Sequence, residues 1–416
     1  MRDAGGACEA VASMVAREFG VVVFGASGFT GQRVLAELAQ TAPNVKWAAA
    51  GRNETKVAAA LREVGLVDTP IVVADCGDSA SLDAMCKRAG VVINCTGPFR
   101  FYGEPVVKAC VENGAHYVDI TGEPEFIERM ELKYSEGAKS AGVHVVTCCG
   151  FDSVPADEGF AFTKQHFGRC TQAESFLTLT VKDGTLAAHA TTFECLVHGY
   201  SSTKDLKKIR EELKSLRPKP VDSVGPKLKV KDFYNDDRVG CFVAKFPGAD
   251  ASVVRRSELY RSAKQQLPQV QYGAYMQIGS WWNAARLGFH QNIITSIIAL
   301  GDAGKKFAID HPGLLTAGVF THEGPSEEQM TNTSFQMTFY AKGYAENAEG
   351  GYTGEPNLKV TTRVSGPEPG YIATPIFVVA AAVTILEEEK NMCEPGVHTP
   401  SLAFEGTLYR DRIIKR

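Results

Sequence analysis

The sequence has no marked excess of charge of either sign and no acidic or basic tail. Its 44 lysine and arginine residues are nearly balanced by 48 aspartate and glutamate residues, so the formal net charge is only -4. A protein that binds nucleic acid through a basic surface needs a clear cationic excess, and we therefore expect no nucleic-acid partner.

The 11 cysteines form no Cys-x-x-Cys pair and no zinc-finger spacing with histidine, so no metal site is predicted. Their odd number and their positions in apolar runs indicate buried free thiols in a reducing compartment, which favours the cytoplasm. The adjacent Cys148 and Cys149 leave a redox pair as an alternative, which would require exposure and a lowered thiol pKa.

The N-terminal 20 residues lack a continuous apolar segment and carry Asp3, Glu9 and Glu18. This pattern is unlike a secretory signal, and it is too acidic for a typical mitochondrial presequence.

No uninterrupted apolar run is long enough to predict a membrane span. The most apolar one, 369–386, contains Thr374-Pro375, which is typical of a helix N-cap followed by proline at the first helical position. A helix from about 375 to 390 would be about 24 Å long, shorter than the roughly 30 Å hydrocarbon core. We expect a buried helix of a soluble protein here.

The 416 residues are 44% hydrophobic, which allows a large core in two or three domains. Phe19–Phe24 is a short apolar run typical of a strand buried on both faces, and the glycine loop 25–31 and a helical pattern follow it. In this G-x-x-G-x-x-G loop we assign the sharp turn to Gly25, the close approach of backbone to a pyrophosphate to Gly28, and helix packing to Gly31. The predicted contacts of the loop with a dinucleotide are Gly25, Ser27, Gly28, Phe29, Thr30 and Gly31. The alternative is a strand-to-helix turn that binds no ligand.

The second expected strand, 46–50, is followed by Arg52 where an NAD enzyme usually places an acid for the ribose. A guanidinium binds phosphate bidentately, so Arg52, with Asn53 and Lys56 beside it, favours NADP(H) over NAD(H). The alternative is a solvated surface arginine.

Strands alternate with helical patterns through about residue 150, which indicates an α/β fold with a doubly wound parallel sheet of the Rossmann type. Ligands of such sheets lie beyond the carboxyl ends of the strands. This rule places Asp75 near the adenine, and Thr96, Gly97 and Pro98 beside the nicotinamide ribose. The further strands are expected at 70–74, 90–95, 115–120 and 143–147.

Eight segments in order make the chain resemble the saccharopine dehydrogenase-like oxidoreductase family. The first part also resembles mycobacterial trans-acting enoyl reductases, and saccharopine reductases are more distantly similar. The segments are GASGFTG (25–31), AGR (50–52), NCTGPFRFYGEPVVKAC (94–110), YVDITGEPEF (117–126), CGFDSVPAD (149–157), DASVVRRS (250–257), GPEPGYIATP (366–375) and GVHTP (396–400).

The resemblance implies a Rossmann domain (1–152), a second α+β domain on a largely antiparallel sheet (153–370), and C-terminal helices (371–416) that return to the first domain. Alternating patterns at 176–181, 334–340 and 358–364 fit strands of such a sheet with one wet face. The resemblance names no substrate.

The second domain carries a basic amphipathic helix from Thr203 and a proline-rich loop that ends near 231. A solvated helix face is the simpler interpretation, and contact with an anionic membrane is the alternative. Trp281, Trp282 and the apolar segment 287–300 favour peripheral contact. The resemblance adds lipid droplets and mitochondria as alternatives to the cytoplasm, and a homodimer stays open.

Hydride transfer also requires a group that gives or takes a proton. The candidates are Tyr102, Glu123 and Asp152, and each has a structural alternative: Tyr102 and Asp152 as loop supports, Glu123 as a helix cap. His189 and His198 are further candidates. The sequence has no Tyr-x-x-x-Lys pair near the fifth strand, no G-x-S-x-G and no H-E-x-x-H.

The leading hypothesis is an NADP(H)-dependent oxidoreductase that acts on a small-molecule or lipid-linked carbonyl, imine or enoyl substrate. The alternative is a nucleotide-binding or lipid-associated scaffold without turnover. An enzyme that forms or cleaves saccharopine is a third hypothesis.

Overall fold

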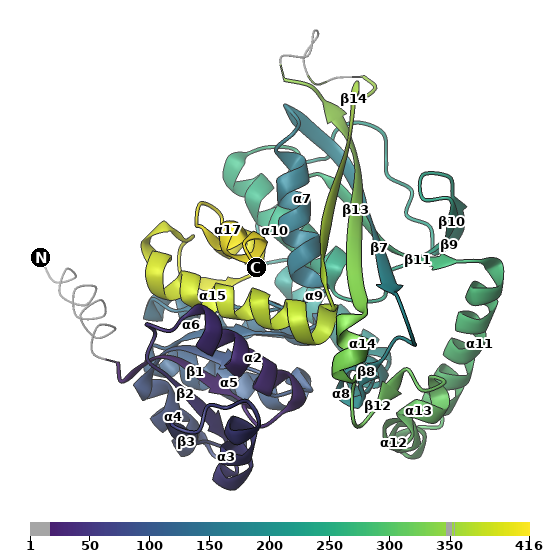
Figure 1. The fold of residues 1–416 in the computed structure, drawn as a ribbon. Helices are drawn as coiled ribbons and strands as arrows, with labels where there is room; N and C mark the ends of the chain where they lie inside the picture. The colour runs from purple at the N-terminus through teal and green to yellow at the C-terminus, as the bar shows by residue number, and fades with distance from the viewer. Residues whose placement is uncertain (1–16, 347–351, 353) are drawn as a thin grey trace, which may run out of the picture. The chain divides into compact units, whose positions relative to one another are not determined.

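The computed structural model describes residues 17–346, 352 and 354–416 (Figure 1). The first 16 residues, which hold Cys8 and most of the acidic N-terminal segment discussed above, lie outside these residues. The chain forms two compact units. Unit 1 contains the described chain up to Thr121, Phe126–Gly150 and Thr374–Arg416, and unit 2 contains Gly122–Glu125 and Phe151–Ala373.

Unit 1 is built on a seven-stranded sheet in the order β15-β6-β5-β4-β1-β2-β3, and every neighbouring pair is parallel. Its central strands are apolar and buried because helices cover both faces. The strand order changes direction between β1 and β4, which is the switch point of a doubly wound sheet. The strands are β1 (Phe19–Phe24), β2 (Trp47–Gly51), β3 (Ile71–Val73), β4 (Ala89–Asn94), β5 (His116–Asp119), β6 (His144–Val146) and β15 (Gly396–His398).

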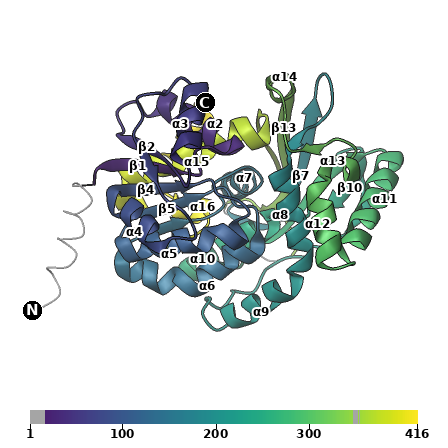
Figure 2. The same ribbon diagram turned by 90° about the horizontal axis from the view of Figure 1, so that it is seen from below.

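In Figure 2, α4, α5 and α6 lie on one side of β1, β4 and β5, and α2, α3 and α15 lie on the other side. This two-sided cover confirms the doubly wound α/β fold expected from the sequence. The helices are α2 (Phe29–Thr41), α3 (Glu54–Glu63), α4 (Ser79–Arg88), α5 (Phe99–Asn113), α6 (Pro124–Ala141), α15 (Thr374–Glu388), α16 (Pro400–Ala403) and α17 (Tyr409–Ile414).

A π-helical turn extends the apolar helix near the C-terminus beyond the start that the sequence predicted. A π-helical turn, η1 (Pro369–Ala373), precedes α15, and the Glu368 carboxylate accepts hydrogen bonds from three backbone N–H groups of this turn, of which that of Tyr371 is 2.6 Å long. The α-helix α15 itself begins at Thr374, within one residue of the predicted start, but Thr374 is not an N-cap, because the helical run continues from η1 and Glu368 caps that turn.

The helical run from Pro369 to Asn391, which ends in the turn η2 (Glu389–Asn391), has 23 residues and is long and apolar enough to cross a membrane. However, 83% of its most apolar window is buried in the protein, and α15 packs on α2, β4 and β5. This is the behaviour of a core helix.

Unit 2 contains a six-stranded mixed sheet in the order β14-β13-β7-β11-β10-β9. Only β7 and β11 pair in parallel, so the sheet is largely antiparallel, as expected. A two-stranded sheet pairs β8 with β12. The strands are β7 (Arg169–Val181), β8 (Ala188–His189), β9 (Phe233–Asp236), β10 (Cys241–Lys245), β11 (Gln271–Gly279), β12 (Phe320–Thr321), β13 (Thr333–Tyr344) and β14 (Leu358–Pro367).

The large sheet of unit 2 is covered on one side by α7, which contacts β7, β13 and β14, and α10 packs against α7 and β11 (Figure 1). The predicted amphipathic helix from Thr203 is α9. The helices are α7 (Ser153–Lys164), α8 (Ala190–Ser201), α9 (Thr203–Leu213), α10 (Asp250–Gln265), α11 (Trp281–Ile298), α12 (Asp302–Asp310), α13 (Pro312–Leu315) and α14 (Glu327–Thr331).

Candidate functional site

The glycine loop has the backbone geometry that its sequence requires. Gly25 adopts a φ of 86°, and a Cβ atom there would lie 3.0 Å from the carbonyl carbon of Cys95. A Cβ at Gly31 would overlap the carbonyl oxygen of Gly25. Glycine is therefore needed at both positions, for the turn and for the close approach of α2 to β1.

The amino end of α2 has no side-chain cap. Gly28 is its N-cap and provides no side chain to the first turn, and the first turn holds no acidic residue. The N–H groups of a first helical turn have no partner within the helix, and the helix dipole adds partial positive charge there. The loop and the first turn of α2 therefore provide backbone donors that suit a pyrophosphate.

Arg52 follows β2 directly at the same edge of the sheet. Its side chain is exposed and makes no hydrogen bond or ion pair with any residue that the structure describes. Asn53 has a structural task, because its Oδ1 accepts a 2.9 Å hydrogen bond from the backbone N–H of Lys56 and caps α3. The Lys56 side chain is exposed.

The remaining predicted contacts also lie at the carboxyl edge of the sheet. Asp75 is partly buried, and its Oδ1 accepts a 2.8 Å hydrogen bond from the N–H of Gly77, which fixes a local turn. The Thr96 hydroxyl donates a 2.6 Å hydrogen bond to Oδ1 of Asn94. Gly97 and Pro98 then lead into α5.

A buried network at this edge was missed by sequence reasoning. It joins Asn94 at the end of β4 to Tyr117 and Asp119 on β5, through hydrogen bonds of 3.1 Å and 2.8 Å. All three side chains are fully buried. The segment YVDITGE contained these residues, but their contacts depend on the pairing of β4 with β5.

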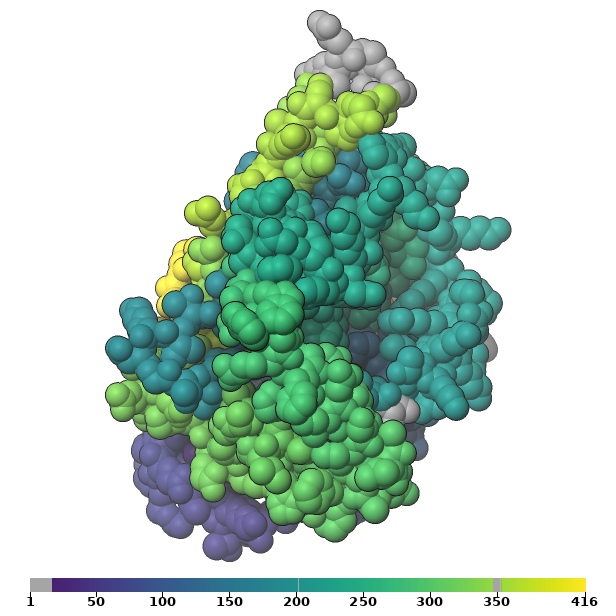
Figure 3. All heavy atoms as spheres, turned by 90° about the vertical axis from the view of Figure 1, so that its right-hand side faces the viewer, coloured from purple at the N-terminus to yellow at the C-terminus, as the bar shows by residue number. Residues whose placement is uncertain are grey.

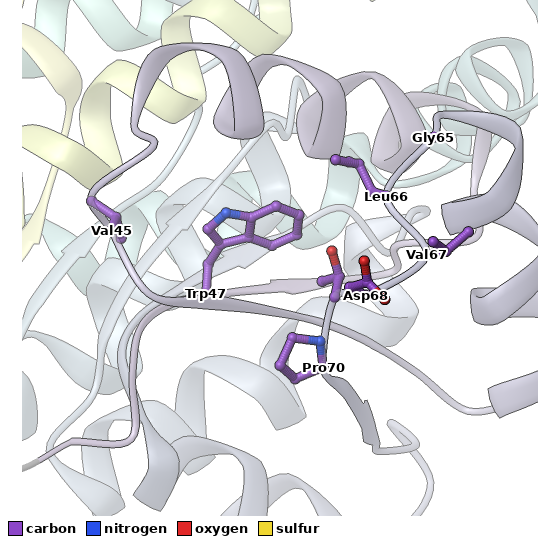
Figure 4. Close-up of a pocket in the computed structure, with 8 residues that line it drawn as sticks. Val45, Trp47, Gly65, Leu66, Val67, Asp68 and Pro70 are labelled. Atoms are coloured by element: carbon purple, nitrogen blue, oxygen red, sulfur yellow. The ribbon is translucent and has the colours of Figure 1, made fainter.

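A shallow hollow of about 330 Å³ lies at the opposite, amino edge of β2 and β3 (Figure 4). Trp47 begins β2, Pro70 immediately precedes β3, and Asp68 lies in the connecting loop. This hollow contains none of the predicted site residues. It also lies at the edge of the sheet where ligands of doubly wound folds do not bind.

The three candidate acid–base residues are divided between the units. Tyr102 lies on the first turn of α5 in unit 1 and is 44% exposed. Glu123 and Asp152 belong to unit 2, and each follows the point where the chain leaves the carboxyl end of a strand of unit 1.

Glu123 is buried among other polar groups of unit 2. Its Oε1 accepts a 3.5 Å hydrogen bond from the Cys195 thiol on α8. Burial, and then the charge of Glu123, raise the pKa of Glu194, whose Oε1 lies 3.9 Å from Nε2 of His198. The structure thus brings two predicted residues, Glu123 and His198, to one cluster, together with Cys195, which the sequence analysis did not single out.

His189 has a structural role. Its ring Nδ1 accepts a hydrogen bond from the N–H of Thr191 and caps α8, and its own N–H donates a 2.7 Å bond to the hydroxyl of Tyr371. These hydrogen bonds give His189 a structural role, so its position in the fold can be explained without a catalytic role.

Asp152 has an unusual backbone conformation for a residue with a side chain. Its φ of 75° and ψ of -72° are those of a strained γ-turn, and its side chain does not cap α7. Burial of the carboxyl group raises its pKa to about 7. A strained residue that titrates near neutral pH is typical of acid–base groups.

In the described part of the chain, no group of three or more histidine, cysteine, aspartate or glutamate side chains suits a metal ion. The ten cysteines in that part are all free thiols. Cys148 and Cys149 are fully buried, and burial raises the pKa of the Cys149 thiol, which disfavours the alternative of a redox pair.

A parallel doubly wound sheet, whose first strand runs through a glycine turn into an uncapped helix, defines a Rossmann-type nucleotide-binding protein. The sequence comparison agrees, because residues 21–146 match the family model described as saccharopine dehydrogenase NADP binding domain.

Curated relatives match nearly the whole chain. A human saccharopine dehydrogenase-like oxidoreductase is 39% identical and covers 96% of each chain, and a Caenorhabditis elegans lipid droplet localized protein is 35% identical over 94% of this chain and 95% of its own. A trans-acting enoyl reductase of Mycobacterium ulcerans is 40% identical over 35% of each chain. The chain belongs to the saccharopine dehydrogenase-like oxidoreductase family.

Among solved structures, the saccharopine dehydrogenase (L-Glu forming) of Saccharomyces cerevisiae matches with a TM-score of 0.51. The match covers 95% of this chain and 96% of that one at 16% sequence identity, so it extends the likeness in fold to both units.

Proposed function

We propose that the protein is an NADP(H)-dependent oxidoreductase. The observation that carries this proposal is the exposed guanidinium of Arg52, which follows β2 at the edge where the glycine loop opens α2. An NAD-specific site would place a carboxylate there to hold the ribose hydroxyls, whereas a guanidinium suits the additional phosphate of NADP(H).

Calorimetry with NADPH and NADH tests this proposal. For wild type we expect tight binding of NADPH and much weaker binding of NADH. Arg52→Ala should weaken NADPH binding by about 10- to 100-fold, since a charge-assisted hydrogen bond contributes about 1.5–3 kcal/mol, and should leave NADH binding unchanged. The matched control is Arg62→Ala, an exposed arginine in the last turn of α3.

Equal affinity of wild type for both nucleotides, or an unchanged preference in Arg52→Ala, would refute the assignment of Arg52. Absence of heat with either nucleotide would refute the oxidoreductase itself.

In this function, the bound dihydronicotinamide supplies a hydride and the protein supplies the proton. Asp152 is the leading proton donor, because burial places its pKa near 7, where both forms of the carboxyl group are populated. Glu123, which accepts a hydrogen bond from Cys195, and Tyr102, on an exposed helical turn, are the other two candidates.

The substrate class we propose is a carbonyl, imine or enoyl compound, small or lipid-linked; the name of the mycobacterial relative favours an enoyl group, and that of the nematode relative favours a lipid. Loss of NADPH absorbance during incubation with lipid and metabolite extracts tests turnover. Nucleotide binding without turnover across such panels would support the alternative of a scaffold. Formation of NADPH from NADP+ with saccharopine, or loss of NADPH with the semialdehyde and glutamate, and with no other compound, would support the third hypothesis.

A second proposed function is contact with a lipid surface through α11. This 18-residue helix has a single charged residue, Arg286, and a single buried one, Ile298. Trp281 and Trp282 are 55% and 73% exposed, and Figure 3 shows α11–α13, in green, at the surface of unit 2. Exposed indoles on an apolar helix suit the boundary between lipid and water.

Flotation with phosphatidylcholine vesicles and triacylglycerol droplets tests this contact. Replacing both Trp281 and Trp282 by serine should abolish most of the bound fraction, whereas Lys207→Glu and Lys208→Glu on α9 should leave it unchanged. Equal flotation of the tryptophan variant and wild type would exclude α11. Residence in the cytoplasm, with recruitment to the lipid-droplet surface as in the nematode relative's name, fits this proposal, and mitochondrial residence is the alternative.

A further inference from the structure

We propose that Asp119 is a positioning residue that holds the loop for the nicotinamide half of the nucleotide; this inference rests on the proposed function. Asp119 is the last residue of β5, and its side chain is fully buried at the carboxyl edge of the sheet in unit 1. It connects the segments that follow three neighbouring strands.

The first connection is to the segment after β6. Oδ1 of Asp119 accepts a 2.8 Å hydrogen bond from the backbone N–H of Cys148, which adopts a positive φ of 56°. The Asp119 carbonyl oxygen also accepts a 2.7 Å hydrogen bond from the N–H of Cys149. A non-glycine residue in this conformation costs free energy, so the contacts to Asp119 help to fix the path of the chain toward Gly150.

The second connection is within the segment after β5 itself. Oδ1 of Asp119 accepts a 3.1 Å hydrogen bond from the N–H of Thr121, which is the last residue of unit 1 before the chain enters unit 2. Oδ1 of Asp119 therefore accepts hydrogen bonds from two backbone segments, the one that leads to Glu123 and the one that leads to Asp152.

The third connection leads to the segment after β4. The Tyr117 hydroxyl donates a 2.8 Å hydrogen bond to Oδ2 of Asp119 and accepts a 3.1 Å bond from Nδ2 of Asn94. Oδ1 of Asn94 then accepts hydrogen bonds from the backbone N–H and the hydroxyl of Thr96, at 3.0 Å and 2.6 Å. Since β4 adjoins β1 at the switch point, the loop that begins with Thr96 is the one that faces the nicotinamide half.

The direction of the hydrogen bonds makes the carboxylate necessary. The Tyr117 hydroxyl has one proton, which it donates in the hydrogen bond to Asp119. Its oxygen accepts the hydrogen bond from the Asn94 amide. In Asp119→Asn, an amide N–H group would replace Oδ2, so the Tyr117 proton would lose its acceptor. Unmatched buried groups are costly, and the chain from Asp119 to Thr96 would rearrange.

The test separates the two halves of the nucleotide. Calorimetry measures binding of NADPH and of 2′,5′-ADP, which carries the adenosine half and the additional phosphate but no nicotinamide. Asp119→Asn should weaken NADPH binding by about tenfold or more, equivalent to about 1.4 kcal/mol, while 2′,5′-ADP binding stays within about twofold of wild type. Tyr117→Phe should have the same selective effect. It provides the test if Asp119→Asn does not fold.

The matched control is Asp68→Asn, an exposed aspartate at the amino edge of the sheet, which should leave both affinities unchanged. A merely structural role for Asp119 predicts that both affinities fall by the same factor, and that outcome, like an unchanged NADPH affinity, would overturn the proposal. Failure of wild type to bind either ligand would instead refute the proposed function.

Discussion

Asp152 and Asp250 stand at the amino ends of α7 and α10, two helices that pack together in unit 2, and the charge of Asp152 raises the pKa of Asp250. Burial is the larger cause for Asp250, and it raises the pKa of Asp152 to about 7. A Cβ atom on Gly248, two residues before Asp250, would lie 3.2 Å from Oδ2 of Asp152. The fold therefore brings two acids together that favour their neutral forms.

Replacing Asp250 by asparagine should stabilise the protein at alkaline pH. Both acids have raised pKa values in the folded state, so the folded protein binds more protons than the unfolded chain above about pH 4. The free energy of unfolding of wild type therefore falls as the pH rises from about 4 through 7. In Asp250→Asn this fall should be smaller, because one of the two acids is gone. We expect a thermal midpoint roughly 5 °C above wild type at pH 8.

Thermal melts from pH 4 to pH 8 measure this difference, with the exposed Asp183→Asn of the same unit as control. If the thermal midpoints of wild type and Asp250→Asn change with pH by the same amount from pH 4 to pH 8, this explanation is wrong.

Gly31→Ala should weaken nucleotide binding. Its Cβ would overlap the carbonyl oxygen of Gly25, so α2 or the glycine turn must shift. Overpacking of this kind costs about 1–3 kcal/mol, and displacement of the turn should weaken NADPH binding by more than about tenfold.

Calorimetry and urea unfolding check both effects of Gly31→Ala. The control is Gly288→Ala on α11, where a Cβ meets nothing within 4 Å. Binding of NADPH with the wild-type affinity by Gly31→Ala would show that the close contact of loop and helix is not needed.

His116 and His144 should make unit 1 sensitive to acid. Burial is the main cause that lowers their pKa values, to about 4 for His116, on which Arg17 also acts, and to about 3 for His144. The unfolded chain therefore binds more protons between pH 6.5 and 4, and stability is lost as the pH falls through this range. The loss is about 3 kcal/mol for each histidine.

Urea unfolding at pH 7 and pH 4.5 tests this prediction. The difference between the two pH values should be smaller in His144→Gln than in wild type and unchanged in His166→Gln, an exposed histidine. The groups that face the pair are His398, which lowers the pKa of His144 further, and Glu389, whose Oε1 is 3.5 Å from Nε2 of His116. A pH dependence in His144→Gln equal to that of wild type would exclude the histidine pair as its source.

The parallel sheet could be predicted because its strands are apolar, mostly buried runs that end in glycine or polar residues. Six of its strands were predicted within one or two residues. The seventh, β15, has only three residues and pairs with β6, about 250 positions earlier in the chain. The strands β3 and β6 are equally short but lie in apolar runs, whereas β15 has one apolar residue, Val397, between Gly396 and His398. It carries no pattern of its own, and only the packed sheet defines it as a strand.

The early start of the helical run at Pro369 could not be predicted, because local signals pointed elsewhere. Thr374-Pro375 is a good N-cap signal, but Glu368 satisfies the preceding N–H groups and extends the run backward. The sequence gives both signals, and the choice between them depends on the burial of Glu368.

Contacts between distant residues were the largest gap for the candidate site. Cys195 lies 72 positions from Glu123, whose Oε1 accepts its hydrogen bond, and no motif joins the two. Asp119 was visible in YVDITGE, but an acid at the end of a strand indicates no particular partner. Its role depends on which strands are neighbours, and this follows only from the pairing of β4, β5 and β6.

The chain passes between the units after Thr121, Glu125, Gly150 and Ala373. Since β15 completes the edge of the first sheet, that sheet stays one strand short on the ribosome until residue 398 has emerged. Neither unit can be released by a single proteolytic cut, and a nascent chain of the first 150 residues would present an unpaired β6 edge to chaperones.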